Sequence, residues 1–336
     1  MVTLKDIARE AGVSITTVSN VVHNKKNRVS PELVAKIQDI MDRVHYVPSM
    51  TARTLANNES PIIGIINHLV PQHSGGVMAD PFHNTFMGSI ENSARKEGYF
   101  LMVRSVEDSR ELETLRHNWS LAGMIFTGLF QDEFFECVRN MGIPYVLIDS
   151  YIDLPEVCNV GLEDQKGGYI ATRYLLEHGH RVIAFTSPFI RKDGVVEKRL
   201  QGYKQALQEF DVPFDPKLVF EQEISINEGM RLGYLLSEKK QITGIFASAD
   251  ILAAGIMAGL REKGVYVPDE KSIVGFDDNY LCQITHPRLT TIHQDAEKKG
   301  TIATEMMMAQ LMRQPIRERN IILPVRLVER ESVRKI

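Results

Sequence analysis

The chain has 336 residues, of which 43% are hydrophobic and 24% charged, and its formal net charge is −4. This length favours two or three domains, and the composition is that of a globular protein with no apolar run long enough to cross a bilayer. The three cysteines lack CxxC spacing, and the N-terminus reads as a polar amphipathic helix rather than a signal peptide. We therefore expect a cytoplasmic protein with reduced thiols and without a disulfide framework.

The first 23 residues have the pattern of two short helices joined by a tight turn. Thr3 and Asp6 have the spacing of a capping box, and Gly12 supplies a left-handed helix stop. Ser14 can cap a second helix, whose inward face would be Val18, Val21 and Val22. Such a pair is a helix-turn-helix, in which the second helix enters the DNA major groove. The residues that this arrangement leaves outside, to contact bases, are Ile15, Thr16 and Asn20.

The alternative is a small helical cap that binds no nucleic acid, and the charge distribution bears on this choice. Residues 1–60 carry eight basic against six acidic side chains, whereas the remainder carries 31 against 37. A positively charged N-terminal segment in an otherwise negatively charged chain favours contact with DNA phosphates. The polar loop at 24–28 is either a solvated turn or a phosphate contact, and its place beside the recognition helix favours the second interpretation.

A further short helix is predicted beyond the helical unit. Pro31 begins the third helix, and Pro48 ends the unit because it disfavours helical geometry in the preceding residue. Residues 49–56 then form one short helix with Ala52 and Leu55 on the same side. An isolated helix of this length is marginal in water, so we expect a partner to hold it. A leucine such as Leu55 can act as a wedge between base steps in the minor groove.

These segments resemble the headpiece of the lactose-repressor/galactose-repressor (LacI/GalR) family of bacterial transcription regulators. The matching stretches begin at Thr3, Thr17, Arg28, Tyr46 and Ala52. The resemblance implies that Ile15, Thr16 and Asn20 contact bases and that two copies of Leu55 enter the operator centre. Family members commonly have Arg where this chain has Asn20, which indicates a different operator half-site. The resemblance also implies DNA contacts from Thr3, Ser14, Thr17, Ser19, Asn27, Arg28 and Ala52.

From residue 61 the sequence alternates between strand and helix patterns. Strands are expected at 62–66, 100–103, 124–126, 145–148, 182–185, 218–220, 244–247, 272–276 and 321–325, with helices between them. Alternation of this kind builds parallel sheets covered by helices on both faces, and there are too many units for one sheet. We expect an all-α helix-turn-helix headpiece (1–48), a hinge helix and linker (49–60), and an α/β core (61–336). The core would have two doubly wound parallel-sheet lobes, divided near 161 and again near 290–325.

Ligands of such sheets bind beyond the carboxyl ends of the strands, here in the cleft between the lobes. Polar residues follow the expected strands at Asp149, Asp250, Asp277 and Asp278. Most aspartates at such places are helix caps or turn residues, and we interpret Asp250 and Asp278 in that way.

Residues 61–330 resemble the periplasmic-binding-protein-like core of the same family, through stretches that begin at Leu176, Arg199, Val274 and Leu289. The resemblance implies an effector site formed by Phe82, Asp149, Arg199, Asp277 and Gln294. An arginine and two aspartates suit the hydroxyls of a sugar or a small anionic ligand. Ile224 and Ala249 stand where the family often has an aromatic residue and an asparagine, and Asp193 is a further candidate for the site.

No motif for nucleotide hydrolysis, hydride transfer or acyl transfer is present, and His178 and His180 lack nearby metal ligands. We therefore expect neither an enzyme nor a cofactor or metal. The absence of a heptad tail predicts a homodimer, and its two-fold symmetry predicts a pseudo-palindromic double-stranded DNA operator.

The predicted function is a DNA-binding transcription repressor, in the cytoplasm and at the nucleoid, controlled by a small-molecule effector in the interlobe cleft. The alternatives are control by a protein corepressor and a stand-alone small-molecule-binding protein.

Overall fold

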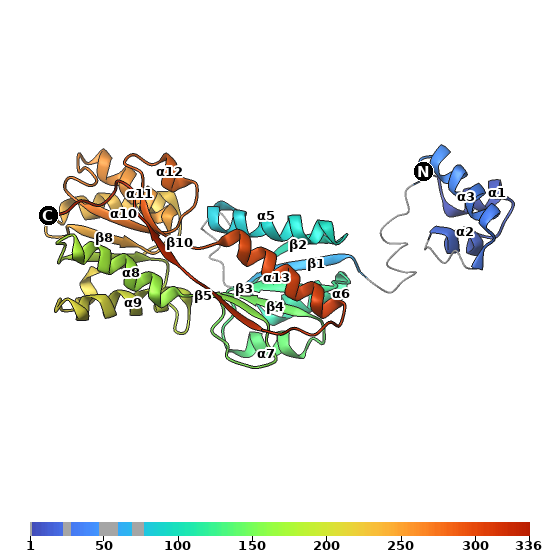
Figure 1. Ribbon diagram of the computed structural model, residues 1–336, viewed down its shortest axis with the longest axis horizontal. Coiled ribbons are helices and arrows are strands. Elements are labelled where there is room, and N and C mark those ends of the chain that lie inside the picture. The colour runs from blue at the N-terminus through green and yellow to red at the C-terminus, as the bar shows by residue number, and fades with distance from the viewer. Residues whose placement is uncertain (1, 23–27, 47–59, 69–76) are drawn as a thin grey trace. The chain divides into compact units, whose positions relative to one another are not determined.

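The computed structural model describes residues 2–22, 28–46, 60–68 and 77–336 (Figure 1). The chain divides into two compact units, Met1–Pro61 and Ile62–Ile336. The predicted hinge helix with Ala52 and Leu55, and Asn27 of the basic loop, lie outside the described residues.

The first unit is helical and contains α1 (Leu4–Ala11), α2 (Ile15–Val22) and α3 (Pro31–Arg43). Its core is formed by one apolar stripe from each helix, led by Ile7, Val18 and Ile37, which are almost completely buried. The predicted capping box is present at the start of α1, and Gly12 ends that helix with a φ of 74°. The predicted helix-turn-helix is therefore confirmed.

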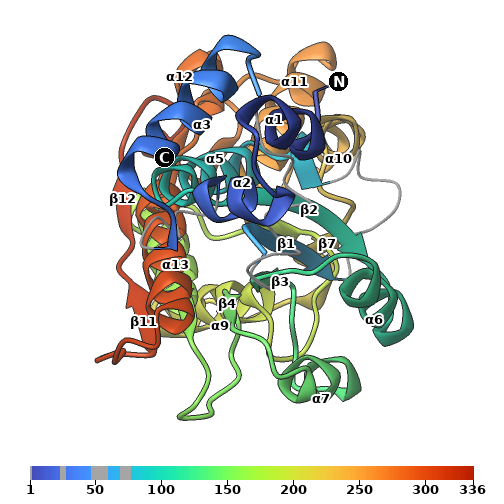
Figure 2. The ribbon, with the colours of Figure 1, turned by 90° about the vertical axis from the view of Figure 1, so that its right-hand side faces the viewer.

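The first lobe of the second unit is a six-stranded sheet, in the order β11-β5-β4-β3-β1-β2, with helices on both faces. Helices α5 and α13 pack against each other on one face, and α6 and α7 cover the other (Figures 1 and 2). The described elements of this lobe are β1 (Ile62–His68), η2 (Val77–Ala79), α5 (Pro81–Lys96), β2 (Phe100–Val106), α6 (Ser109–Asn118), β3 (Gly123–Thr127), α7 (Glu133–Asn140), β4 (Tyr145–Ile148), β5 (Asn159–Leu162), α13 (Ala296–Leu311) and β11 (Asn320–Leu323).

The second lobe repeats this plan with the strand order β12-β10-β9-β8-β6-β7. Helices α8 and α9 form one layer, and α10 and α11 form the other. Its described elements are α8 (Asp164–Glu177), β6 (Ile183–Ser187), α9 (Val195–Glu209), η3 (Pro216–Leu218), β7 (Val219–Glu221), α10 (Ile226–Glu238), β8 (Gly244–Ala247), α11 (Asp250–Glu262), β9 (Ser272–Asp277), α12 (Leu281–Ile284), β10 (Thr290–His293) and β12 (Arg326–Val328).

The chain passes between the lobes after β5, after β10 and between β11 and β12. The expected two parallel-sheet lobes are thus confirmed, with one antiparallel edge where β12 pairs with β10. Sequence analysis missed β5, β10 and β12, which are only three or four residues long. Equally short strands such as β4 and β8 were predicted because they are continuous apolar runs, whereas β5, β10 and β12 mix apolar residues with polar or charged ones.

Candidate functional site

The outer surface of α2 presents side chains that the core does not use. Val18 and Val21 point inward with exposed fractions of 0% and 5%, whereas Ile15 retains 48% of its surface. Thr16 is also exposed, and Asn20 is half-buried. An exposed isoleucine at the first position of a recognition helix is available for contact with base edges or thymine methyl groups.

Two other candidates for DNA contact have structural partners of their own. The Ser14 hydroxyl accepts a hydrogen bond from the backbone N–H of Thr17 at 3.1 Å and so caps α2. Thr3 donates to Asp6 through its hydroxyl at 2.6 Å, and this bond lowers the pKa of the Asp6 carboxyl. Ser19 is half-buried and Arg28 is exposed.

A cavity of about 200 Å³ lies between the two lobes and is lined by residues from both. First-lobe walls come from the start of α5 and the ends of β3 and β4. Second-lobe walls come from the start of α9 and the ends of β8 and β9. The cavity therefore stands beyond the carboxyl ends of the strands, as parallel sheets dictate. The predicted effector residues that line it are Phe82, Asp149, Arg199, Ile224, Asp277 and Gln294.

Asp193 is placed differently from this prediction. It is exposed and does not line the cavity, although the next residue, Gly194, does. The Asp193 backbone has a φ of 58°, and its N–H donates to the Glu197 carboxylate at 2.8 Å, which holds the residue in the turn before α9. The structure does not bring Asp193 together with the other candidates.

A chain of polar contacts runs along the cavity from the first lobe to the second. The Lys299 ammonium of α13 donates to both carboxylate oxygens of Asp149 at 2.7 Å and to the Gln294 amide oxygen at 3.0 Å. The Gln294 amide nitrogen donates in turn to Asp277 at 2.6 Å. Burial raises the pKa of Asp277 well above its usual value, and the nearby carboxylates of Asp250 and Asp80 raise it further.

Arg199 is held by a second buried ion pair. Its Nε donates to Asp164 at 2.8 Å, its Nη1 donates to the Ser248 carbonyl at 2.7 Å, and its guanidinium lies 3.6 Å from the Phe276 ring. The other Asp164 oxygen accepts from the Tyr151 hydroxyl of the first lobe at 2.8 Å. Burial raises the pKa of Asp164, and Arg199 opposes this shift.

Glycines, among them Gly168 and Gly202, permit the close packing of α8 and α9 on which this ion pair depends. A Cβ at Gly202 of α9 would lie 1.9 Å from the carbonyl oxygen of Gln165 in α8. Any larger residue would push the two helices apart, and with them Arg199 and Asp164.

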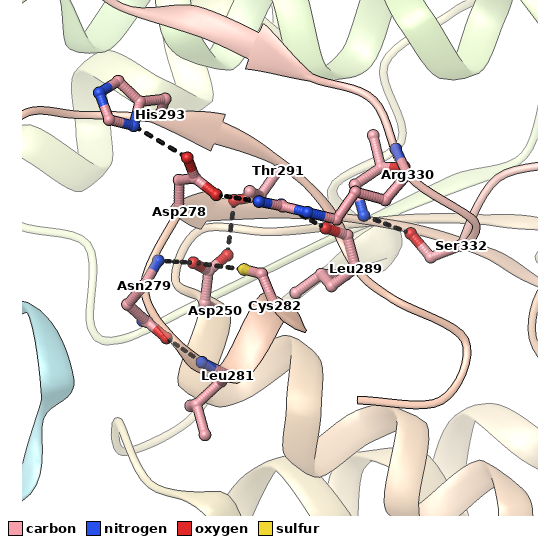
Figure 3. Close-up of polar contacts among 11 residues, drawn as sticks. Asp250, Asp278, Asn279, Leu281, Cys282, Leu289, Thr291, His293, Arg330 and Ser332 are labelled. Carbon is pink, nitrogen blue, oxygen red and sulfur yellow. Dashed lines mark hydrogen bonds and ion pairs between the residues drawn. The ribbon is translucent and has the colours of Figure 1, made fainter. Parts of the chain in front are cut away.

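Asp278 is a turn residue, as expected, with a φ of 60°. Asp250 is not the helix cap that was expected, because its carboxylate accepts from other elements and not from α11 (Figure 3). Asp250 accepts from Thr291 at 2.6 Å, from the Asn279 backbone at 3.0 Å and from the Cys282 thiol at 3.0 Å. Asp278 lies between Arg330 and His293, at 2.6 and 2.9 Å. These contacts connect the ends of β9 and β10 with α11 and α12, and Arg330 connects them to the C-terminal segment that follows β12.

Sequence analysis missed several residues at or behind the cavity, among them Lys299, Asp164, Asp80, His83 and Ser248. Lys299 follows another lysine and looks like part of a solvated surface, yet it stands four residues before the buried Ala303 and seven before the buried Met306. That helical spacing was the available signal. Asp164 is the first residue of α8, and an acidic residue in the first turn of a helix gives no sequence signal for an ion pair with a distant arginine.

Neither a membrane-spanning helix nor a metal-binding cluster of three His, Cys, Asp or Glu residues is found among the described residues. The model of the periplasmic binding protein-like domain matches residues 172–333. The model of the bacterial regulatory proteins of the lacI family matches residues 3–49.

Relatives and solved structures resemble the chain over nearly its whole length. The HTH-type transcriptional repressor PurR of Edwardsiella ictaluri is 32% identical, with 99% of this chain and 97% of the relative covered. The ribose operon repressor of Haemophilus influenzae is 30% identical, with 99% of each chain covered.

A lac repressor dimer bound to operator and an anti-inducer has a TM-score of 0.83 at 25% identity, with 99% of each chain covered. A regulator from Enterococcus faecium with bound ribose has a TM-score of 0.71 at 28% identity, covering 82% of this chain and 99% of that one. The chain therefore belongs to the lacI family of bacterial regulatory proteins and is a DNA-binding transcriptional regulator rather than an enzyme.

Proposed function

We propose that this protein is a homodimeric repressor whose operator affinity is controlled by a small polar molecule in the interlobe cavity. The observation that carries the proposal is the continuous contact from Asp149 through Lys299 and Gln294 to Asp277. This series of hydrogen bonds connects the strand ends of the two lobes beside the cavity. A ligand that replaces one of these bonds therefore changes the position of one lobe relative to the other. The same chain carries a helix-turn-helix with Ile15 and Thr16 exposed.

The relatives support both halves of the proposal. The lac repressor structure contains a dimer on an operator, and the Enterococcus faecium regulator holds ribose. A ligand that binds the two cleft conformations unequally must shift operator affinity, with a coupling of about 1–3 kcal/mol in typical allosteric systems. The protein would act in the cytoplasm and associate with the nucleoid when it is bound to an operator.

The first experiment is operator selection from random duplex DNA, followed by a salt titration of the selected sequence. We expect a pseudo-palindromic consensus, because a two-fold dimer presents two copies of α2, and an affinity that falls steeply with salt. Repeating the titration with a protein-free extract of bacterial metabolites should change the affinity. No enrichment with or without extract contradicts operator binding. Enrichment without any effect of the extract contradicts control by a small molecule and favours a protein corepressor.

A further inference from the structure

The charges around the interlobe cavity do not balance. Three carboxylates line it, those of Asp80, Asp149 and Asp277, and a fourth, Asp164, lies directly behind Arg199. Against these four stand, among the described residues, the cations Arg199 and Lys299 and the His83 imidazole, which is positively charged only when protonated. With the four carboxylates, Arg199, Lys299 and His83 all ionised, the described residues around the cavity have an excess of one negative charge.

Both cations are already paired with a carboxylate. Lys299 has no exposed surface and directs its donors at Asp149 and Gln294. Arg199 is paired with Asp164, whose side chain is completely buried. A paired, hydrogen-bonded cation attracts a second anion weakly, because its field is largely cancelled by its first partner. The site therefore offers little to an anionic ligand.

Asp80 and Asp277 are the lining carboxylates that have no lysine or arginine partner among the described residues. Asp80 accepts from the Phe82 backbone at 3.1 Å and faces the His83 ring at 2.7 Å. Among the described residues, the Asp277 side chain accepts a hydrogen bond from the neutral Gln294 amide. Burial and then neighbouring carboxylates raise the pKa of its carboxyl, and Arg199 opposes this shift without forming an ion pair with it. Both residues are 8% exposed, so water screens their charges poorly.

An independent observation also points to a ligand at this place. Ser248 lines the cavity and is 1% exposed, yet its hydroxyl has no hydrogen-bond partner among the residues that the structure describes. The hydroxyls of Thr186 and Ser187, at the end of the neighbouring strand β6, are likewise buried without a partner there. Buried hydroxyls without partners are rare, which indicates that a polar ligand or water completes them.

These observations lead to an inference that rests on the proposed function and names the ligand class. We propose that the effector is a small hydroxyl-bearing molecule with a positively charged nitrogen. The nitrogen binds between Asp80 and Asp277, and a hydroxyl of the molecule forms a hydrogen bond with the Ser248 hydroxyl. The nitrogen supplies a positive charge and donates hydrogen bonds to two carboxylates that have no lysine or arginine partner among the described residues. The cavity of about 200 Å³ restricts the effector to a molecule of monosaccharide size or smaller.

The test is a thermal-shift assay of the full chain against a protein-free bacterial metabolite extract. The extract is divided into fractions that a cation exchanger retains, that an anion exchanger retains, and that pass both. We expect stabilisation by the cationic fraction, because a ligand that binds only the folded state raises the unfolding temperature. Stabilisation by only the neutral or the anionic fraction overturns the charge assignment but leaves small-molecule control intact. Stabilisation by no fraction contradicts the proposed function itself, and the inference fails with it.

A matched pair of variants locates the effect. Asp80→Asn removes the charge but keeps an N-cap for α5, since asparagine caps helices as well as aspartate does. Asp153→Asn removes an exposed carboxylate of the same lobe and is the control. We expect Asp80→Asn to need roughly tenfold more of the cationic fraction for the same shift, and Asp153→Asn to match the unaltered chain. An unchanged response of Asp80→Asn overturns the assignment.

Discussion

The Lys299 ammonium lies 2.7 Å from both carboxylate oxygens of Asp149, and the lysine side chain is completely buried whereas the aspartate retains 17% of its surface. A buried lysine without a partner would lose its charge or admit water. Asp149 is thus the group that allows a cation inside the first lobe. Because Asp149 adopts a φ of 53°, its own backbone is also held in a conformation that few residues tolerate.

Removing the lysine tests how much this pair stabilises the core. Lys299→Met fills similar volume but leaves Asp149 without its cation, and we expect the free energy of unfolding to fall by about 2–4 kcal/mol. Adding Asp149→Asn, which tolerates positive φ, should recover at least half of that loss because no unpaired charge remains. Denaturant unfolding of the four proteins of this cycle measures both values. Losses that simply add would show that the two residues are not coupled.

The exposed face of α2 allows a test of DNA contact that is separate from folding. Ile15→Ala removes an exposed side chain, so the thermal unfolding of the headpiece should be nearly unchanged while operator affinity falls roughly tenfold. Fluorescence anisotropy with the selected operator measures the affinity. Gln38→Ala, an exposed change on α3, is the control and should leave both quantities as they are. Equal affinity of Ile15→Ala and the unaltered chain would contradict a role for α2 in base contact.

Ser14 separates helix capping from DNA contact, since it is a candidate for both. Ser14→Ala removes the acceptor of the Thr17 N–H and should destabilise the headpiece by about 1 kcal/mol. Ser14→Asp keeps the cap and should unfold like the unaltered chain, but its negative charge should weaken operator binding if the residue faces phosphates. Circular dichroism melts and anisotropy titrations give the two readouts. Normal operator binding by Ser14→Asp would leave Ser14 with the capping role alone.

The architecture was predictable from the sequence because it depends on patterns that repeat. The capping box at Thr3, the glycine stop at Gly12 and the alternation of strands and helices each rest on local spacing, and all three appear in the structure. The strand ends that supply Asp149 and Asp277 to the cavity follow from the same alternation together with the geometry of parallel sheets.

The pairing of charges within each lobe beside the cavity was not predictable in this way. Lys299 and Asp149 are 150 positions apart, and Arg199 and Asp164 are 35 apart. Each contact depends on how elements distant in the sequence pack within one lobe, which local spacing does not encode. The likeness to a known family led to Arg199 and Asp277, but it gave no indication of Asp164 or of Lys299, which pairs with Asp149. The chain-specific part of the site therefore became visible only in three dimensions.

The buried carboxyl of Asp250 makes the stability of the folded chain depend on pH. Burial raises its pKa to about 7, against the hydrogen bonds from Cys282, Thr291 and Asn279 that lower it. The folded chain therefore binds a proton more tightly than the unfolded chain between about pH 4 and 7, and the stability that this group contributes is lost as the pH rises through that window.

Asp250→Asn removes the titration. The stability of the variant relative to the unaltered chain should therefore improve by about 1–2 kcal/mol between pH 5 and pH 7. Denaturant unfolding of both proteins at the two pH values measures this difference, with Asp153→Asn as a control that should show none. A constant difference between Asp250→Asn and the unaltered chain at both pH values would mean that Asp250 stays ionised throughout. Its three donors would then outweigh the cost of its burial.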